Sequence, residues 1–233
     1  MSYQEKLLPL HCQKTKGTLL TIKTLSIMTN KNFNTNGFEY VDLDLPSGAL
    51  WATKNVGASK ATDYGLYFQW GDTKGYSADQ VGSGKRKKEF SLDWNFYRWF
   101  DGDIITKYLL INSKLELEDD AAHIHMGGDW HIPSPTKIQE LIDNTISEWT
   151  SFYGVSGMKF ASKKDSSKYI FIPAAGYAFN GSVHSDGDVC NVWSYMLTSS
   201  YTKTAKFLHC HSVGPLLCSD YRICGFSVRG IIG

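Results

Sequence analysis

The chain has 233 residues, of which 42% are hydrophobic and 20% are charged, and its formal net charge at pH 7 is +1. This length and composition are typical of a globular protein with one main domain, and the near-zero charge argues against a nucleic-acid partner. The five cysteines include no C-x-x-C pair, so we expect neither a zinc ribbon nor a closed disulfide framework, and we expect synthesis in a reducing cytosol.

Residues 1–37 are predicted to form a basic N-terminal extension. The first 32 residues hold five lysines and a single acid. The apolar run at 19–28 is interrupted by Lys23 and lacks a small-residue cleavage site, so we expect no signal peptide and no membrane insertion. We expect the extension to dock on its own domain, on a neighbouring subunit of a homo-oligomer or on a larger assembly.

Short strands and Gly-rich turns are predicted from residue 38 onward. Residues 39–45 alternate between apolar and polar, 46–48 carry turn residues and 49–53 resume the pattern, which predicts a hairpin. Residues 59–70 are predicted to hold a short helix. Residues 72–118 form a long polar region with an aromatic cluster that we expect to fold back onto the core. The cluster consists of Trp94, Phe96, Tyr97, Trp99 and Phe100.

The clearest predicted helix begins at Ser134. Ser134 suits the N-cap, Pro135 suits the first helical position, and Ile138, Leu141 and Ile142 fall on one face at helical spacing. Strands are then expected at residues 158–162, 169–173, 192–197, 205–211 and 223–228. These elements predict an α+β fold, mainly antiparallel sheet with about two helices.

The amino-acid composition changes abruptly near the C-terminus. Trp, Met, Lys, Gln and Glu supply 44 of the first 206 residues and none of the last 27. At the earlier rate of about one in five, this absence would arise by chance roughly twice in a thousand trials. These are the five residue types that an asparagine codon cannot reach when only its adenines change. The pattern therefore indicates adenine-directed mutagenesis of asparagine codons.

Residues 207–224 mix apolar, polar, Cys and His residues with a period of neither 2 nor 3.6. A core strand rarely mixes these types so freely, so we interpret the segment as a display surface. In an extended segment Phe207, His209 and His211 would project together, while Leu208 and Cys210 point to the other side. The alternative, that its apolar residues belong to the core of the last hairpin, stays open.

Several fixed motifs frame this segment, among them LPSGALWAT at 45–53, DDAAH at 119–123, GGDW at 127–130, PAAGY at 173–177 and GFSVR at 225–229. With shorter motifs at 55–58, 64–65, 67–68, 70–71 and 193–194, they resemble the Fibrobacter succinogenes major paralogous domain over about residues 38–229. The resemblance implies a C-type-lectin fold of the formylglycine-generating-enzyme-like kind for residues 38–233. It also implies similarity to variable proteins of diversity-generating retroelements, with the variable segment at about 190–224.

A variable protein binds its ligand through the diversified residues. Trp193, Met196, Lys203 and Lys206 cannot come from a mutated asparagine codon, so we assign them to the framework. The candidate ligand-binding residues are Val192, Tyr195, Phe207, His209, His211, Val213, Leu216, Leu217, Cys218, Asp220, Tyr221, Ile223 and Cys224. We expect a subset of them to share one solvent-accessible face, namely Phe207, His209, His211, Leu216, Leu217, Asp220, Tyr221 and Ile223.

Two groups of residues contain the side-chain types that ligate metals. The Cys and His residues after position 207 are zinc-ligand types, but Cys210 would face away from both histidines and the cysteine spacings match no zinc knuckle. The acids near Asp119 lack the spacing of an EF-hand calcium loop. We therefore expect no metal and no cofactor, and we expect Cys190, Cys210, Cys218 and Cys224 to form no required disulfide set.

These observations predict a non-enzymatic ligand- or receptor-binding protein whose C-terminal face a retroelement diversifies. The expected partner is a protein or glycan on a cell surface, and the expected location is a phage tail or a cell-surface assembly. One alternative is an undiversified adhesin or structural module of the same family. A third is a thiol enzyme of the formylglycine-generating type that uses Cys218 and Cys224, which have only Arg222 nearby to lower a thiol pKa.

Overall fold

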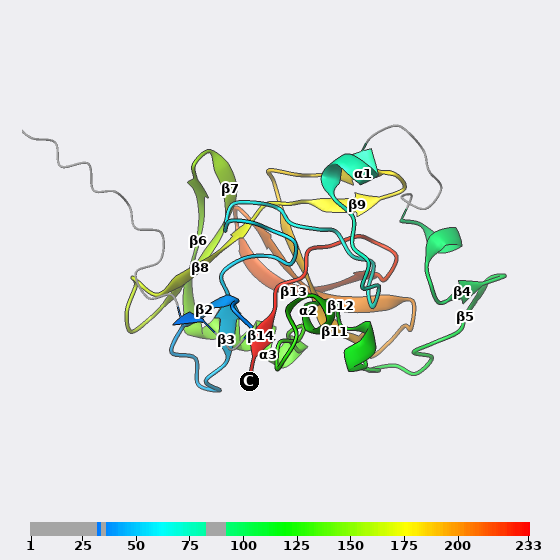
Figure 1. Cartoon of the computed structure of the whole chain (residues 1–233), viewed down its shortest axis with the longest axis horizontal. Helices are drawn as coiled ribbons and strands as arrows, with labels where there is room; N and C mark the ends of the chain where they lie inside the picture. The colour runs from blue at the N-terminus through cyan, green and yellow to red at the C-terminus, as the bar shows by residue number, and fades with distance from the viewer. Residues whose placement is uncertain (1–31, 34–35, 83–91) are drawn as a thin grey trace, which may run out of the picture.

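The computed structural model describes residues 32–33, 36–82 and 92–233 (Figure 1). In this part of the chain, strands and bridges take 39% of the residues and helices 14%. The strands form five small antiparallel sheets without closure, and the helices are short. The expected α+β C-type-lectin fold is therefore wrong: the described chain is mostly antiparallel β-structure, because turns and strand pairs replace helix over most of its length.

The first sheet joins the two ends of the described chain. Its strand order is β1-β2-β3-β14. The strands are β1 (Asn32–Phe33), β2 (Glu39–Asp42), β3 (Leu50–Ala52) and β14 (Ile231–Ile232). The predicted hairpin of residues 39–53 is confirmed, since Val41 pairs with Trp51. Residues 1–31 and 34–35 of the predicted extension lie outside the described residues, so its docking stays a prediction.

Short elements occupy the described residues between 59 and 126, namely 59–82 and 92–126. The helix predicted at 59–70 is wrong, because turns occupy it and Gly65 has φ +76°, where a Cβ would lie 2.5 Å from the carbonyl oxygen of Val56. Tyr97 and Trp99 are buried, as predicted, whereas Phe96 is exposed. The elements are α1 (Ala78–Gly82), the 3₁₀ turns η2 (Trp94–Phe96) and η3 (Leu117–Asp119), β4 (Phe100–Asp101), β5 (Ile104–Ile105) and α2 (Ala121–Met126).

The predicted helix at Ser134 is confirmed as α3 (Pro135–Asn144). The Ser134 hydroxyl accepts a hydrogen bond from the Lys137 amide at 3.0 Å, and Ile138 and Leu141 are fully buried. A three-stranded antiparallel sheet follows (Figure 1). Its strands are β6 (Thr145–Phe152), β7 (Val155–Ser162) and β8 (Tyr169–Pro173), the last with the predicted bounds.

The C-terminal third forms a hairpin and a three-stranded sheet of order β11-β12-β13. The strands are β9 (Tyr177–Phe179), β10 (Ser182–His184), β11 (Cys190–Leu197), β12 (Thr204–His211) and β13 (Gly214–Tyr221). The strand predicted at 223–228 is wrong: Phe226 makes an isolated bridge to Phe68 and Ser227 one to Val192. The apolar residues of 223–228 are buried because they pack in the core, and not because they alternate along a strand.

Two core clusters lie against the β11-β12-β13 sheet. The first core cluster includes Phe68, Trp70, Trp193, Phe207 and Phe226. The second core cluster combines side chains from the first and second halves of the sequence. It includes Val41, Trp51, Ile138, Leu141, Ile170, Val192, Leu208 and Cys210. Because alternate residues of β11 and β12 enter different clusters, the sheet separates the two. No helix in the part described is long and apolar enough to cross a membrane.

Candidate functional site

The residues of β12 alternate between two environments. Leu208 and Cys210 are fully buried and belong to the second core cluster. Phe207, His209 and His211 follow one another on the opposite side, with ring centroids 6.0 Å apart for the first pair and 5.3 Å for the second. The predicted alternation is therefore confirmed. It arises from the period of two in an extended strand.

The pairing of β12 with β13 extends this side across the sheet. Directly opposed residues in an antiparallel pair lie on the same face. Cys218 pairs with Phe207, Leu216 with His209, and Asp220 with Ala205. We call His209, His211, Leu216, Cys218 and Asp220 the display face. Leu216 is exposed and the other four are partly exposed, so these side chains reach solvent together.

The remaining candidate residues divide into three groups. Val213 and Tyr221 are exposed, but Tyr221 packs edge-on against Trp94 with centroids 6.2 Å apart. Tyr195 and Leu217 are partly buried, each against a core cluster. The buried candidates are Val192, Phe207, Ile223 and Cys224.

The prediction of one accessible face for eight residues is therefore wrong in part. Phe207 and Ile223 are core residues, at 5% and 3% exposure. Leu217 pairs with Leu208 and lies on the opposite side of the sheet. The alternative that apolar residues of this segment belong to the core is correct at these positions, because both faces of the sheet must cover a cluster.

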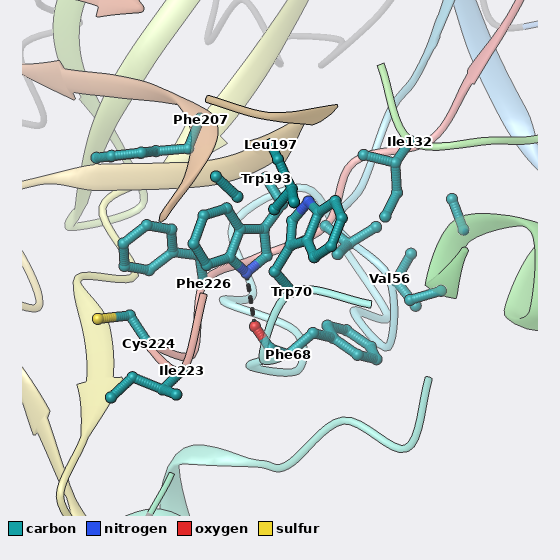
Figure 2. Packing of buried hydrophobic residues seen from close by; sticks show 14 of the residues in the cluster. Val56, Phe68, Trp70, Ile132, Trp193, Leu197, Phe207, Ile223, Cys224 and Phe226 are labelled. Carbon is teal, nitrogen blue, oxygen red and sulfur yellow. Dashed lines mark hydrogen bonds between the residues drawn. The ribbon is translucent and has the colours of Figure 1, made fainter. Parts of the chain in front are cut away.

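Framework residues anchor the sheet on the same side as the display face, since Trp193 is opposed to Phe207 in the pairing of β11 with β12. Trp193 stacks on Phe226 with ring centroids 4.2 Å apart, and its indole Nε1 donates a 2.7 Å hydrogen bond to the carbonyl oxygen of Phe68 (Figure 2). Figure 2 also shows Phe207, Ile223 and Cys224 around this pair. The framework motif GFSVR is buried throughout, as its assignment to the framework requires.

Asn191 is a residue of this region that the sequence did not single out. Its Oδ1 lies 2.7 Å from Nδ1 of His209, and its side chain is almost fully buried. An amide oxygen only accepts, so His209 Nδ1 donates this hydrogen bond. Burial, and then the neighbouring His211, lower the pKa of His209. Only the register of β11 against β12, which places Asn191 opposite His209, reveals the pair.

The four cysteines of the described chain are free thiols, of which Cys190, Cys210 and Cys224 are buried and Cys218 is partly exposed. Cys190 and Cys210 are opposed in the β11-β12 register and both are fully buried. Burial raises the pKa of Cys210 and of Cys218, and it raises the pKa of Cys224 to about 12. Protonated thiols are poor nucleophiles and poor metal ligands.

We expect iodoacetamide to alkylate Cys218 before the other three, because Cys218 alone among them is partly exposed. Peptide mapping by mass spectrometry after a time course should show Cys190, Cys210 and Cys224 protected until the chain unfolds. The melting temperature should not change when a reductant is added. Rapid alkylation of Cys224 in the folded protein, or a large loss of stability on reduction, would show that these thiols serve chemistry.

One acidic group has the spacing of a metal site. Carboxylate oxygens of Glu116, Glu118 and Asp119 lie within 4.8 Å of one another. The Lys107 ammonium contacts all three, at 2.6, 3.2 and 2.6 Å, and Arg98 lies 3.1 Å from Asp119. Protein cations therefore already neutralise these acids, and the arrangement joins neighbouring loops electrostatically.

Three cavities of the described chain are lined by residues other than the display face. A cavity of about 370 Å³ lies beside β3 and is lined by residues including Glu39, Asn55 and His125. Another of about 520 Å³ includes Tyr64 and Asp186, and a third of about 490 Å³ includes His123 and His131. The display face is thus a surface feature rather than the wall of one of these cavities.

No family model, curated protein or solved structure matches the chain.

Proposed function

We propose that this chain is a non-enzymatic binding protein that presents variable side chains on the display face of the β11-β12-β13 sheet. In this proposal a retroelement diversifies the segment at about residues 190–224 through the adenines of asparagine codons. The partner is a protein or a glycan on a cell surface. The chain acts in a phage tail or a cell-surface assembly, to which residues 1–37 attach it.

The composition of β13 is the observation that carries the proposal. β13 lies at the edge of its sheet, and all its side chains are at least partly exposed. Lys, Glu and Gln are common on protein surfaces, yet none occurs from residue 207 to the end of the chain. Selection for solubility does not remove these types from an exposed strand. Mutagenesis restricted to the adenines of asparagine codons does, because it cannot produce them.

The mixed chemistry of the display face supports a macromolecular partner. Two imidazoles, an aliphatic side chain, a thiol and a carboxylate lie side by side, so the face has no charge of a single sign. An exposed surface of such mixed character suits contact with a protein or with sugar hydroxyls better than enclosure of a small molecule. The raised pKa values of Cys218 and Cys224 favour this function over that of a thiol enzyme.

We expect a combined His209→Ser, His211→Ser and Leu216→Ser variant to lose binding while keeping its fold. Surface substitutions usually change stability by less than about 0.5 kcal/mol each. Fluorescently labelled protein would be tested on a panel of bacterial cells and on immobilised glycans. Any target bound by the parent chain should bind the variant about tenfold or more weakly, and the circular dichroism melts should nearly coincide.

The matched control changes exposed residues on another edge strand. Ile146→Ser with Glu148→Ser alters β6, whose side chains at these positions are also exposed, and it should leave target binding unchanged. Equal binding by the display-face variant and the parent would contradict the proposed surface. A loss of binding in the β6 variant alone would place the contact elsewhere.

The undiversified adhesin or structural module remains the alternative function, and the surrounding DNA distinguishes the two. A diversified protein requires a near-identical downstream repeat that differs from the coding sequence at adenines, beside a reverse-transcriptase gene. Sequencing the locus in several isolates should show substitutions concentrated in codons 190–224. A locus without the repeat would leave a binding module of fixed specificity.

A further inference from the structure

Two histidine rings stand side by side at the end of β12. His209 and His211 are two residues apart on an extended strand, so they share a face, and both are partly exposed. Their ring centroids are 5.3 Å apart and their planes are inclined by 48°. Neutral imidazole nitrogen is among the preferred ligands of Zn²⁺, so this pair is a candidate chelate.

The spacing of the rings matches that of two imidazoles on one ion. A zinc–nitrogen bond of about 2.0–2.1 Å places the ion about 3.2 Å from an imidazole centroid, so two rings at a tetrahedral angle have centroids about 5.2 Å apart. The observed separation is 5.3 Å. The backbone of β12 therefore already holds the two rings at the distance that the chelate requires.

Asn191 selects the tautomer of His209 whose Nε2 is free to bind a metal. The 2.7 Å hydrogen bond from His209 Nδ1 to the Asn191 oxygen places the ring proton on Nδ1 and leaves the lone pair of Nε2 available. A partner of this kind orients metal-ligating histidines in proteins. Asn191 is only 4% exposed, so the surrounding core keeps its oxygen in place.

The Val213 amide, which is hydrogen-bonded to His211, can report metal binding. The Nδ1 atom of His211 accepts a 3.2 Å hydrogen bond from the Val213 amide, so the proton of the neutral ring lies on Nε2. An ion bound at Nε2 would require that proton to move to Nδ1, where the Val213 amide could no longer donate. An ion bound at Nδ1 would displace the amide directly. In both cases the Val213 amide loses its acceptor.

We propose that His209 and His211 form a two-histidine site for Zn²⁺, with Asn191 as the positioning residue. The cysteines take no part, since Cys210 lies on the opposite side of the sheet and Cys218 pairs with Phe207. Two protein ligands leave the remaining coordination positions of a tetrahedral ion to water or to a carboxylate or imidazole of a partner. The site stands independently of the proposed function, although a partner ligand would act on the display face.

The test uses the full chain, stripped with chelator and passed over a desalting column, and ZnCl₂ alone as the probe. Isothermal titration calorimetry at neutral pH should show saturable binding of one zinc ion at the pair, and MgCl₂ should give none because imidazole suits zinc and not magnesium. In ¹H–¹⁵N spectra the Val213 amide should shift with the same saturation curve. His209→Gln or His211→Gln should weaken this binding about tenfold or more.

Matched variants separate the histidine pair from other ligands. His131→Gln, whose ring bonds to the Asp129 carbonyl, and Cys218→Ser should both bind zinc like the parent. Asn191→Leu should weaken binding about 10- to 100-fold, and Asn191→Asp, which keeps an acceptor, should restore it. Melting curves in chelator confirm that each variant is folded.

Unchanged zinc binding in both histidine variants would overturn the site, as would loss of binding in Cys218→Ser. Absence of saturation up to about 1 mM zinc would also overturn it. Because zinc is the only probe, these outcomes do not depend on whether the display face binds a cell surface. Failure of the cell-binding experiment would in turn leave the zinc result untouched.

Discussion

Replacing Arg229 with methionine is expected to lower the free energy of unfolding by about 3–5 kcal/mol. The Arg229 side chain is fully buried, and its donors bond to Asn55 Oδ1 at 3.0 Å and to the carbonyl oxygens of Ala52 and Phe171 at 2.9 Å each. Methionine fills a similar volume but leaves three buried acceptors unpaired. Each such acceptor costs about 1–3 kcal/mol.

The guanidinium of Arg229 keeps its charge at neutral pH without a carboxylate among these partners. Burial lowers its pKa to about 9, which still leaves it protonated. Ala52 lies on β3, Asn55 just after β3 and Phe171 on β8, so one side chain ties the last residues to two sheets. Removing it should therefore lower the cooperativity of unfolding as well as the midpoint.

Urea unfolding followed by circular dichroism measures the effect of Arg229→Met. Arg229→Lys is the matched control: it keeps the charge, but an ammonium cannot donate in the fixed fork that reaches three separate oxygens. We expect the free energy of unfolding of Arg229→Lys to lie between those of the parent and of Arg229→Met. A loss below about 1 kcal/mol for Arg229→Met would mean that water or local relaxation satisfies the three acceptors.

Trp193→Ala is expected to cost about 3–5 kcal/mol of unfolding free energy. Its ring packs against Phe226 and Phe207, with centroids 4.2 and 5.9 Å away, and the side chain is 1% exposed. Truncation would open a cavity in the first core cluster and remove the hydrogen bond to Phe68. Trp51→Ala and Trp130→Ala, also at fully buried positions, should fall in the same range.

Conservative variants separate packing from hydrogen bonding at these tryptophans. In the described chain, the buried Nε1 atoms of Trp51 and Trp130 have no hydrogen-bond partner. Trp193→Phe should therefore lose more stability than Trp51→Phe, because only Trp193→Phe removes a buried hydrogen bond, although the Phe68 carbonyl oxygen still accepts from the Phe226 amide. His209→Ala should cost far less than any tryptophan truncation. Thermal melts with the reverse order would contradict the division into framework and display face.

Local signals in the sequence predicted those elements whose cause is itself local. The Ser134 cap and Pro135 determine where α3 begins, and the turn at 46–48 predicted the first hairpin. The helix expected at 59–70 failed because Gly65 approaches the Val56 carbonyl, a tertiary contact that leaves no periodic signal. The strand expected at 223–228 failed because its buried apolar residues pack in the first core cluster without pairing as a strand.

The sequence predicted which residues of β12 share a face of the sheet, but not how β12 pairs with β13 and β11. Alternation on β12 follows from the sequence, so His209 and His211 were correctly placed together. β13 begins with Gly214 and Pro215 and mixes Ser, Cys and Asp, which hid its strand character. Without its pairing to β12, the burial of Ile223 and the opposite side of Leu217 could not be inferred. Asn191 was missed for the same reason.

The position of the β11-β12-β13 sheet between two clusters limits how efficiently such a segment can vary. Neighbouring residues of β12 lie in different environments: His209 faces solvent, while Leu208 and Cys210 pack in the second core cluster. If these strands are diversified as proposed, random changes at consecutive codons alter core residues as often as residues of the display face. They therefore affect folding as often as binding. Most multiply changed chains would then be lost to misfolding before they met a target. Templates that confine adenines to every second codon would yield more folded variants for the same number of mutations.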